Sequence, residues 1–372
     1  MSNVILKRRD AVYELINSKD LVGMILAAPE SIQYLTGLTE PSIHTCGKVI
    51  FGRKGEPVLA VMWLDQEVAQ KQAGGTYVES YTPTTQVTVI ASVLEKLAAK
   101  SGYIGMDTRS MQILGNGLRQ YIPNLQLINV SNQVEELRSV KGKDEIESIR
   151  QACQLAEAGM RTVANSLRPG ITELHLAATA EFEMMRLGSD KLKHSTGVAS
   201  GYRSRLPHAF ASQKKIDDGD IVVVDLGAVC NGYCSDLTRT FVVGKSENKY
   251  QLAFNALVKT QQSVLKRLRP GIPIQELQLL PREMIKEHGY KMVGHMGHNI
   301  GLRVEEHPQL VGMVTPDPEH IIRENNVLAF FQGSIRQEGT LSFGVRLEDT
   351  ILVTASGGEF LTNYPRELVS VG

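Results

Sequence analysis

A four-residue sequence occurs twice in the second half of the chain, at the same place in two similar helical units. LRPG at residues 167–170 recurs at residues 268–271, 101 positions later. In each copy a helical pattern precedes the Pro-Gly turn and resumes after it, and the second helix is expected to end at a glycine, Gly188 or Gly289. Two units of similar length and the same order predict a pseudo-symmetric α+β domain with a cleft between its halves.

The first third of the chain follows a different pattern, in which short β-rich runs alternate with helical segments. This alternation predicts a layered α/β domain. The runs occupy residues 48–52, 56–63, 75–81, 103–107 and 125–130, and helical segments include residues 5–18 and 89–100. A long helical stretch follows at 133–167, so we predict an N-terminal α/β domain at 1–132 and a second domain at 133–372.

The charge balance of the chain excludes several classes of partner. Forty Lys and Arg residues offset forty Asp and Glu residues, which removes the electrostatic case for nucleic acid or an anionic membrane. No apolar run approaches the roughly 20 residues that span a bilayer, and the opening MSNVILKRRD is not a secretory signal. The four cysteines are scattered without a disulfide framework, so we expect a cytoplasmic protein.

A β-hairpin with a two-residue turn is predicted for residues 221–243. Asn231-Gly232 between β-rich flanks is typical of a type I′ turn. With that turn, Asp225 lies opposite Thr238, and Asp225 and Asp236 point to the same face as diagonal neighbours, with Cα atoms roughly 7–8 Å apart.

Two carboxylates on one face of an apolar hairpin need a positive charge between them. One divalent cation, or two that share Asp236, would supply it. The alternative is that one aspartate faces solvent or pairs with Arg239. A further carboxylate, Glu348, lies in the strand-like stretch 343–354, although a strand glutamate is usually exposed.

At this point the sequence resembles the aminopeptidase P, prolidase and creatinase superfamily over nearly its whole length. DLGAVCNGYCSDLTRTF is similar to the hairpin of that family, and LRSVKGKDEIESIRQAC, RLPHAFASQKKIDDGDIVVVD, GHNIGL and GVRLEDTILVT are similar to its other motifs. The resemblance implies a creatinase-type N-terminal α/β domain and a pita-bread α+β C-terminal domain.

The resemblance also implies a site for two divalent metals (Mn, Co or Zn) with ligands in the order Asp, Asp, His, Glu, Glu. Four of these positions are matched by Asp225, Asp236, His298 and Glu348. His208 matches the histidine that assists the tetrahedral intermediate, and Arg346 matches the arginine beside the last ligand.

Two positions depart from the family pattern. Phe331 stands where the fourth ligand, a glutamate, belongs, and Gln332 replaces the proline after it. A one-residue bulge could turn Gln332 inward as a weak ligand, but we favour plain loss of the ligand. In GHNIGLRVEEHP, Glu305 takes the position of the family's second histidine, and His307 lies two residues further on. A shift of two keeps the strand face, so His307 either reaches the cleft or lies on the surface.

The resemblance implies a metal-dependent Xaa-Pro peptidase-like hydrolase of short peptides, with a degenerate metal site and a homodimeric assembly. One alternative is a metal-independent, creatinase-like hydrolase of a small guanidino or cyclic compound, with His208 as acid and base and Glu305 at the substrate. Another is an inactive peptide-binding member, which Phe331 and Glu305 would favour. The four retained ligands favour the metallopeptidase. His295 is expected to pack on the strand face opposite His298, and Cys230 and Cys234 to act as small apolar residues.

Overall fold

The computed structural model separates the chain into two units, Met1–Arg138 and Ser139–Gly372. It describes residues 3–372 except residues 40, 74, 100, 208, 295, 311–319, 332–333 and 338–342. The predicted division after residue 132 falls inside helix α7 (Ser131–Ser139), which spans the observed division. Within the described part of the chain, no helix is long and apolar enough to cross a membrane.

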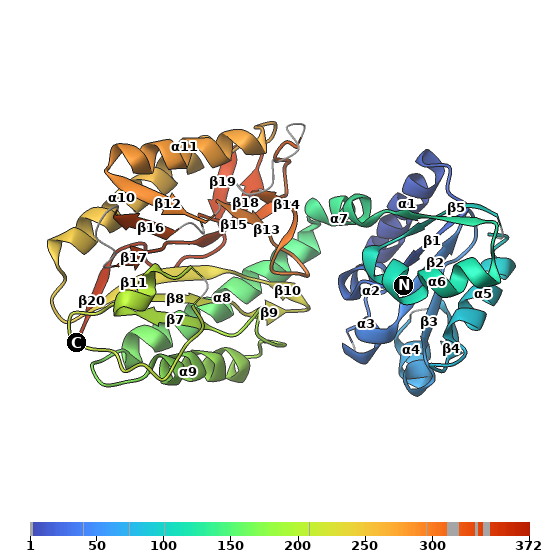
Figure 1. The fold of residues 1–372 in the computed structure, drawn as a ribbon, viewed down its shortest axis with the longest axis horizontal. Helices are drawn as coiled ribbons and strands as arrows, with labels where there is room; N and C mark the ends of the chain where they lie inside the picture. Colours follow the sequence, from blue (N-terminus) through green and yellow to red (C-terminus); the bar gives the residue numbers. More distant parts are fainter. Residues whose placement is uncertain are drawn as a thin grey trace. The chain divides into compact units, whose positions relative to one another are not determined.

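The first unit is a six-stranded mixed sheet covered by helices (Figure 1), as predicted for the N-terminal α/β domain. The strand order is β4-β3-β2-β1-β5-β6. Each of the five predicted β-rich runs overlaps one strand, whereas the sixth strand, β1, lies outside them. The strands are β1 (Gly23–Leu26), β2 (Lys48–Gly52), β3 (Val58–Met62), β4 (Tyr77–Tyr81), β5 (Gly102–Met106) and β6 (Leu125–Asn129). The helices are α1 (Asn3–Ser18), α2 (Pro29–Thr36), α3 (Pro41–Cys46), α4 (Gln66–Gln72), α5 (Gln86–Lys96) and α6 (Thr108–Tyr121).

The helical stretch predicted at 133–167 is wrong in one respect, because it forms two helices, α7 and α8 (Lys143–Ser166). Three residues separate them. Val140 pairs with Asn326 in an isolated β-bridge, and the buried Lys141 ammonium lies 3.3 Å from a carboxylate oxygen of Glu306. Gly142 is extended and caps α8. These tertiary contacts outweigh the local helical preference of the sequence.

The second unit contains the predicted internal repeat. Helices α9 (Glu173–Arg186) and α11 (Ile274–Glu287) each have 14 residues, and each follows an LRPG turn. The backbone N–H of Gly170 donates to the carbonyl of Ile216 at 2.8 Å, and that of Gly271 donates to the carbonyl of Ile322 at 2.8 Å. Both glycines are left-handed, with φ of 84° and 89°, which explains why glycine ends both turns. The pseudo-symmetric α+β prediction is therefore confirmed.

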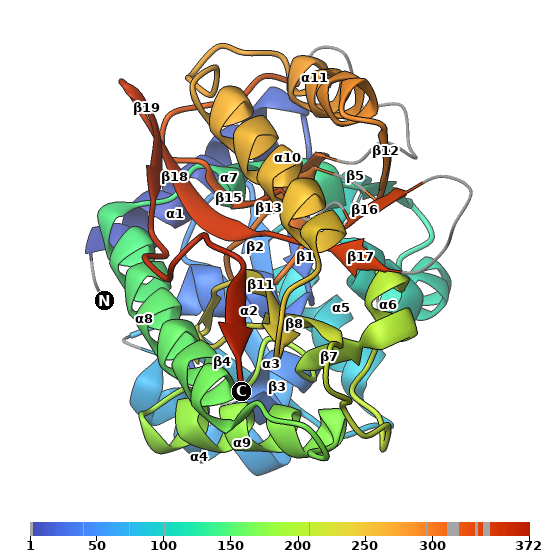
Figure 2. The ribbon, with the colours of Figure 1, turned by 90° about the vertical axis from the view of Figure 1, so that its left-hand side faces the viewer.

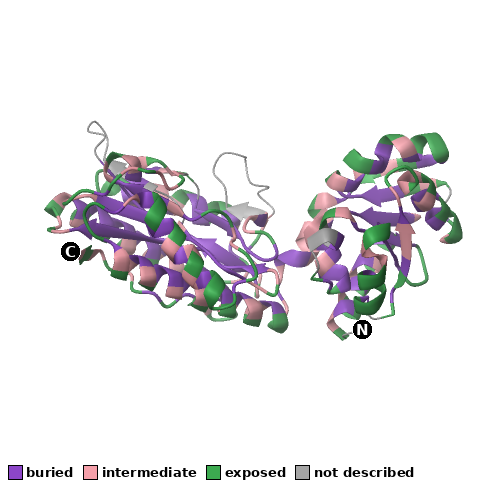
Figure 3. Cartoon of the chain, turned by 90° about the horizontal axis from the view of Figure 1, so that it is seen from below, coloured by how far each residue is buried: buried purple, intermediate pink, exposed green. Residues whose placement is uncertain are grey.

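Strands from both halves of the second unit lie between its helix pairs. Figures 1 and 2 show α8 and α9 on one side of the strands, and α10 (Asn248–Leu265) and α11 on the other. A four-stranded sheet has the order β20-β11-β8-β7, and a five-stranded sheet has the order β14-β13-β15-β18-β19. In Figure 3 these strands are buried, whereas the helices have exposed outer faces.

The strands of the second unit have the following bounds. The first sheet contains β7 (Gly197–Ser200), β8 (Ile221–Leu226), β11 (Leu237–Val243) and β20 (Val369–Val371), and β9 (Val229–Cys230) and β10 (Tyr233–Cys234) form the hairpin tip. The five-stranded sheet contains β13 (Gly297–Asn299), β14 (Glu306–Leu310), β15 (Val327–Phe330), β18 (Asp349–Thr354) and β19 (Gly357–Phe360). A third sheet contains β12 (Tyr290–Val293), β16 (Ser334–Gln337) and β17 (Gly344–Val345). A β-bridge between Thr238 and Glu348 connects the first two sheets at the point where the predicted ligands lie.

Candidate active site

The hairpin of β8 to β11 has the predicted register. Cys230 pairs with Tyr233, and Asp225 pairs with Thr238. Asn231 and Gly232 have φ of 50° and 80°, as a type I′ turn requires. The register brings Asp225 and Asp236 to the same face, where both carboxylates contact a single side chain.

That side chain is Lys193, from the segment between α9 and β7. Its Nζ lies 2.8 Å from Oδ1 of Asp225 and also contacts Oδ1 of Asp236, and its side chain is completely buried. Burial alone would lower the pKa of Lys193, but the two aspartates outweigh burial and raise the pKa above its ordinary value. Lys193 is therefore an ammonium ion. Arg239, the alternative partner for an aspartate, pairs instead with Asp349, at 2.7 Å.

Arg346 provides a second buried cation beside these carboxylates. Its Nη1 lies 3.0 Å from Oδ2 of Asp225, and its Nη2 lies 3.4 Å from Oε2 of Glu348. Asp225 thus has a cation on each carboxylate oxygen. Burial opposes ionisation of Asp225, but Lys193 and Arg346 outweigh it and hold the pKa of this carboxyl well below its usual range.

His298 and Glu348 complete the cluster. His298 is buried on β13, with Nε2 3.9 Å from Oδ2 of Asp236. Burial lowers the pKa of His298 despite the nearby charge of Asp236, so the imidazole is neutral at neutral pH. Burial, together with the charges of Asp236 and Asp225, raises the pKa of Glu348 well above its ordinary value. Oε2 of Glu348 accepts a hydrogen bond from Thr238 Oγ1 at 2.9 Å.

These residues fit one divalent ion. Ligand atoms of Asp236, His298 and Glu348 all lie within 4.8 Å of one another, and all three residues are buried. Oε1 of Glu348 is buried and has no hydrogen-bond partner among the described residues. One imidazole nitrogen and two carboxylates form a donor set that suits Mn, Co or Zn and leaves coordination positions open. Asp225 is not part of this group.

The position of the missing ligand is occupied by an apolar side chain. Phe331 is fully buried in the core of the second unit, and its ring lies 5.8 Å from that of Phe330. Its φ is 78°, and its N–H donates to the carbonyl of Met296 at 2.7 Å. Phe331 therefore offers no donor atom for a metal. Gln332, the suggested weak ligand, lies outside the described residues, as does His295.

The altered segment around Glu305 has two separate environments. The negative charge of Glu305 acts on His298 and opposes the effect of burial on its pKa. His307, on β14, contacts His320 instead, with the two Nε2 atoms 2.8 Å apart. Glu305 thus lies within electrostatic reach of the cluster, whereas the ring of His307 is engaged by another histidine.

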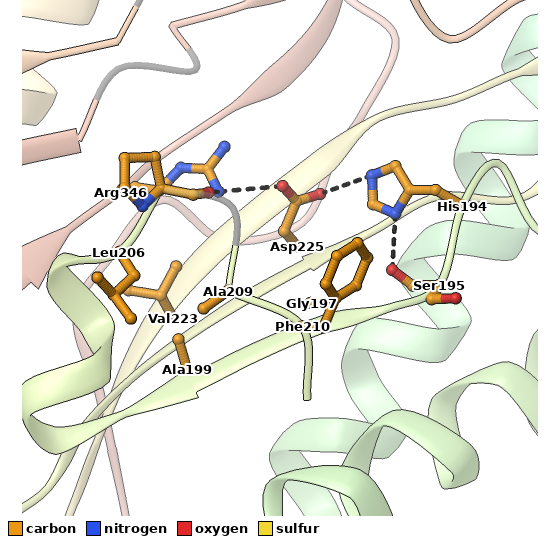
Figure 4. Close-up of a pocket in the computed structure, with 11 residues that line it drawn as sticks. His194, Ser195, Gly197, Ala199, Leu206, Ala209, Phe210, Val223, Asp225 and Arg346 are labelled. Atoms are coloured by element: carbon orange, nitrogen blue, oxygen red, sulfur yellow. Dashed lines mark hydrogen bonds and ion pairs between the residues drawn. The ribbon is translucent and has the colours of Figure 1, made fainter. Parts of the chain in front are cut away.

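A cavity of about 190 Å³ opens beside Asp225 and Arg346 (Figure 4). Its other walls come mainly from small or apolar residues: Gly197, Ala199, Leu206, Pro207, Ala209, Phe210 and Val223, with Ser195 and His194 at one side. Nε2 of His194 lies 3.7 Å from Oδ1 of Asp225. His208 itself lies outside the described residues, but the residues on either side of it, Pro207 and Ala209, both line the cavity.

Sequence reasoning missed Lys193 and His194. The only signal for them was indirect: two buried aspartates require a positive charge, and the segment DKLKHSTG, next to β7 in the chain, carries lysines and a histidine. No spacing rule connects that segment to the hairpin. The contact became visible only in the folded chain.

Comparison with known proteins identifies the family. Residues 147–355 match the model of metallopeptidase family M24, and residues 8–140 match the creatinase/prolidase N-terminal domain. The chain belongs to metallopeptidase family M24. It is 30% identical to an Xaa-Pro dipeptidase of Pyrococcus furiosus over 366 residues, which covers 98% of this chain and 99% of the relative.

Solved structures agree with this M24 assignment. An Xaa-Pro dipeptidase from Bacillus anthracis superposes with a TM-score of 0.89 at 29% identity, covering 99% of this chain and 100% of that one. A prolidase from Pyrococcus furiosus superposes with a TM-score of 0.83 at 29% identity, covering 95% and 99%. The predicted superfamily, its pita-bread fold and its hydrolase character are confirmed, and the peptidase interpretation is favoured over the creatinase-like one. Membership of M24 implies dependence on a divalent metal.

Proposed function

We propose that this M24 enzyme hydrolyses short peptides with proline in the second position, using a divalent ion held by Asp236, His298 and Glu348. The observation that carries the proposal is the convergence of these three buried donors beside an apolar cavity in the M24 unit. We also propose that the enzyme is a homodimer and that it acts in the cytoplasm. The dimer is tested by light scattering of the purified protein.

A bound divalent ion would supply Lewis-acid activation of a carbonyl and acidification of a water molecule. Neutral His298 offers an imidazole lone pair to that ion, because burial keeps its pKa low. Asp236 and Glu348 offer carboxylate oxygens from positions immediately before β11 and β18. All three donors are buried and lie in or directly before strands of the core, so the fold holds them in place before substrate binds.

Three of the chain's own groups set the charge and orientation of the site. Burial and the charges of Asp236 and Asp225 raise the pKa of Glu348, so this carboxyl holds a proton more readily than an exposed glutamate does. His194, at the cavity wall, has its Nε2 3.7 Å from Oδ1 of Asp225. Arg346 orients Asp225 and Glu348 through its two Nη atoms. We further assign His208 and Glu305 to substrate contact and His307 to a supporting role.

The cavity suits a small apolar group. Leu206, Phe210 and Ala199 give it apolar walls, and Asp225 and Arg346 form its polar end. A pyrrolidine ring fills such a space without polar groups of its own, and because the proline nitrogen carries no N–H, it needs no acceptor from the wall.

The test is hydrolysis of Xaa-Pro dipeptides and tripeptides by purified protein, with and without added Mn, Co or Zn. Matched Xaa-Ala peptides are the substrate control, and Asp236→Asn is the enzyme control. Cleavage of Xaa-Pro bonds that a chelator abolishes and a metal restores is the expected result. Undiminished cleavage by the chelated protein or by Asp236→Asn would refute the metal-dependent mechanism, and preference for the Xaa-Ala peptides would refute the substrate.

A further inference from the structure

The contact of Lys193 with both hairpin aspartates has a consequence for how many ions the site can hold. The Nζ atom lies 2.8 Å from Asp225 and contacts Asp236, so it stands between the two carboxylates that would otherwise share a cation. The lysine side chain has no exposed surface, whereas the Asp225 side chain is 15% exposed. The ammonium is therefore shielded from solvent while it contacts the two carboxylates.

The backbone holds the lysine at this place. Its N–H donates to the carbonyl of Gly227 at 3.2 Å, and the neighbouring Leu192 forms a β-bridge with Ala228. A Cβ atom at Gly227 would lie 2.1 Å from the carbonyl oxygen of Ser235 and 2.5 Å from Cδ of Lys193. The lysine stem therefore fills the space that the glycine leaves, and the two residues form one packed unit between the hairpin and the segment that precedes β7.

Charge counting leads to the same conclusion. Three carboxylates, those of Asp225, Asp236 and Glu348, directly contact two cations, Lys193 and Arg346. With all five groups ionised, this contact network carries one net negative charge. One divalent ion changes this to one net positive charge. Two would leave three positive charges in a buried cluster, with one ion directly against an ammonium, and such a buried excess is strongly unfavourable.

We propose that the Lys193 ammonium is a built-in cation that replaces one ion of a metal pair, so that the centre accepts at most one divalent ion, at Asp236, His298 and Glu348. The buried Phe331 supports a single ion, because an apolar ring occupies the position that would complete the ligand set of a metal pair. The inference concerns the same site as the proposed function and rests on it only for the presence of a metal.

The experiment measures how many Mn²⁺ ions each chain binds. Purified protein is stripped with a chelator, titrated with Mn²⁺ and analysed by elemental analysis after gel filtration, with electron paramagnetic resonance of free Mn²⁺ as a second readout. The unaltered chain is expected to bind no more than one ion. Lys193→Met keeps the aliphatic stem and removes the charge, and it is expected to bind one ion more. Lys191→Met, at an exposed lysine of the same segment, is the matched control and is expected to bind as the unaltered chain does.

Two ions per unaltered chain would overturn the proposal, and so would an unchanged count in Lys193→Met. The ion count of the unaltered protein tests the proposal even if the Lys193→Met variant does not fold. In crystals soaked in Mn²⁺, an anomalous peak between Asp225 and Asp236 would refute the assignment, whereas density for the lysine there, with no anomalous peak, supports it. Peptide hydrolysis is not used as a readout, so a protein that fails to cleave Xaa-Pro peptides still gives a decisive ion count.

Discussion

The coupling between Lys193 and Asp225 can be measured by a double-mutant cycle in the metal-free protein. The two charged atoms are 2.8 Å apart and largely buried. At an effective dielectric constant of about 20, their direct attraction is about 6 kcal/mol. Desolvation of both groups offsets much of this, so the pair itself is expected to show a coupling energy of about 2–3 kcal/mol.

Each single variant leaves a buried charge with one partner fewer. Lys193→Met leaves Asp225 and Asp236 facing each other, and Asp225→Asn leaves Lys193 and Arg346 with less compensation. We expect each to lower the free energy of unfolding of the second unit by about 3–5 kcal/mol. The double variant removes both charges and should be less destabilised than the sum of the singles by the coupling energy.

The assay is urea denaturation followed by far-UV circular dichroism, with a chelator present throughout, because an ion that binds only the folded state would add stability. The chain has one tryptophan, Trp63, which lies in the first unit. Its fluorescence reports the unit that the variants leave unaltered and is an internal control. Effects that add to within 0.5 kcal/mol would refute direct contact between Lys193 and Asp225.

Three further predictions use other parts of the molecule. Phe331→Ala should lower the free energy of unfolding by about 3–5 kcal/mol in urea melts, because it empties a buried ring site, and should leave Mn²⁺ stoichiometry unchanged; a change in ion count would contradict the apolar role. Gly170→Ala and Gly271→Ala should each cost about 1–2 kcal/mol by the same measurement, since both residues are left-handed and no atom lies within 4 Å of an added Cβ; unequal costs would argue against equivalent turns. Burial lowers the pKa of Lys48 from 10.5 to about 8 in the folded state. Below pH 8 the buried ammonium destabilises the folded state by its full amount, and this destabilisation is lost as the pH rises towards 10.5. Relative to Lys48→Met, the unaltered protein should therefore gain up to about 3 kcal/mol over that window in pH-dependent denaturation, and a pH-independent difference would refute the shift.

Local rules in the sequence were enough to predict much of this fold. A two-residue Asn-Gly turn permits one register, so the pairing of Asp225 with Thr238 followed from the turn alone. Five of the six strands in the first unit could be located because β-rich runs are separated by turn residues, and only β1 was missed. Repeated LRPG turns indicated a two-fold arrangement, because each requires a glycine with positive φ at the same point between two helices.

The break between α7 and α8 shows where such rules stop. Residues 140–142 have helical neighbours on both sides, but a β-bridge from Val140 to Asn326 and an ion pair from Lys141 to Glu306 draw them out of the helix. Both partners are more than 160 residues away in sequence. A local pattern carries no information about contacts at that separation.

The sequence by itself determined that two aspartates share a face and therefore need a positive charge, since hairpin register and the cost of burying like charges are both local arguments. Only the tertiary structure decided which cation neutralises the two aspartates. Lys193 is 32 residues from Asp225 and 43 from Asp236, and it reaches them because the missing side chain of Gly227 leaves room for its stem. Whether a buried carboxylate meets a metal or an ammonium depends on which side chain the packed fold brings within hydrogen-bonding distance, and that distance is set by contacts remote in the chain.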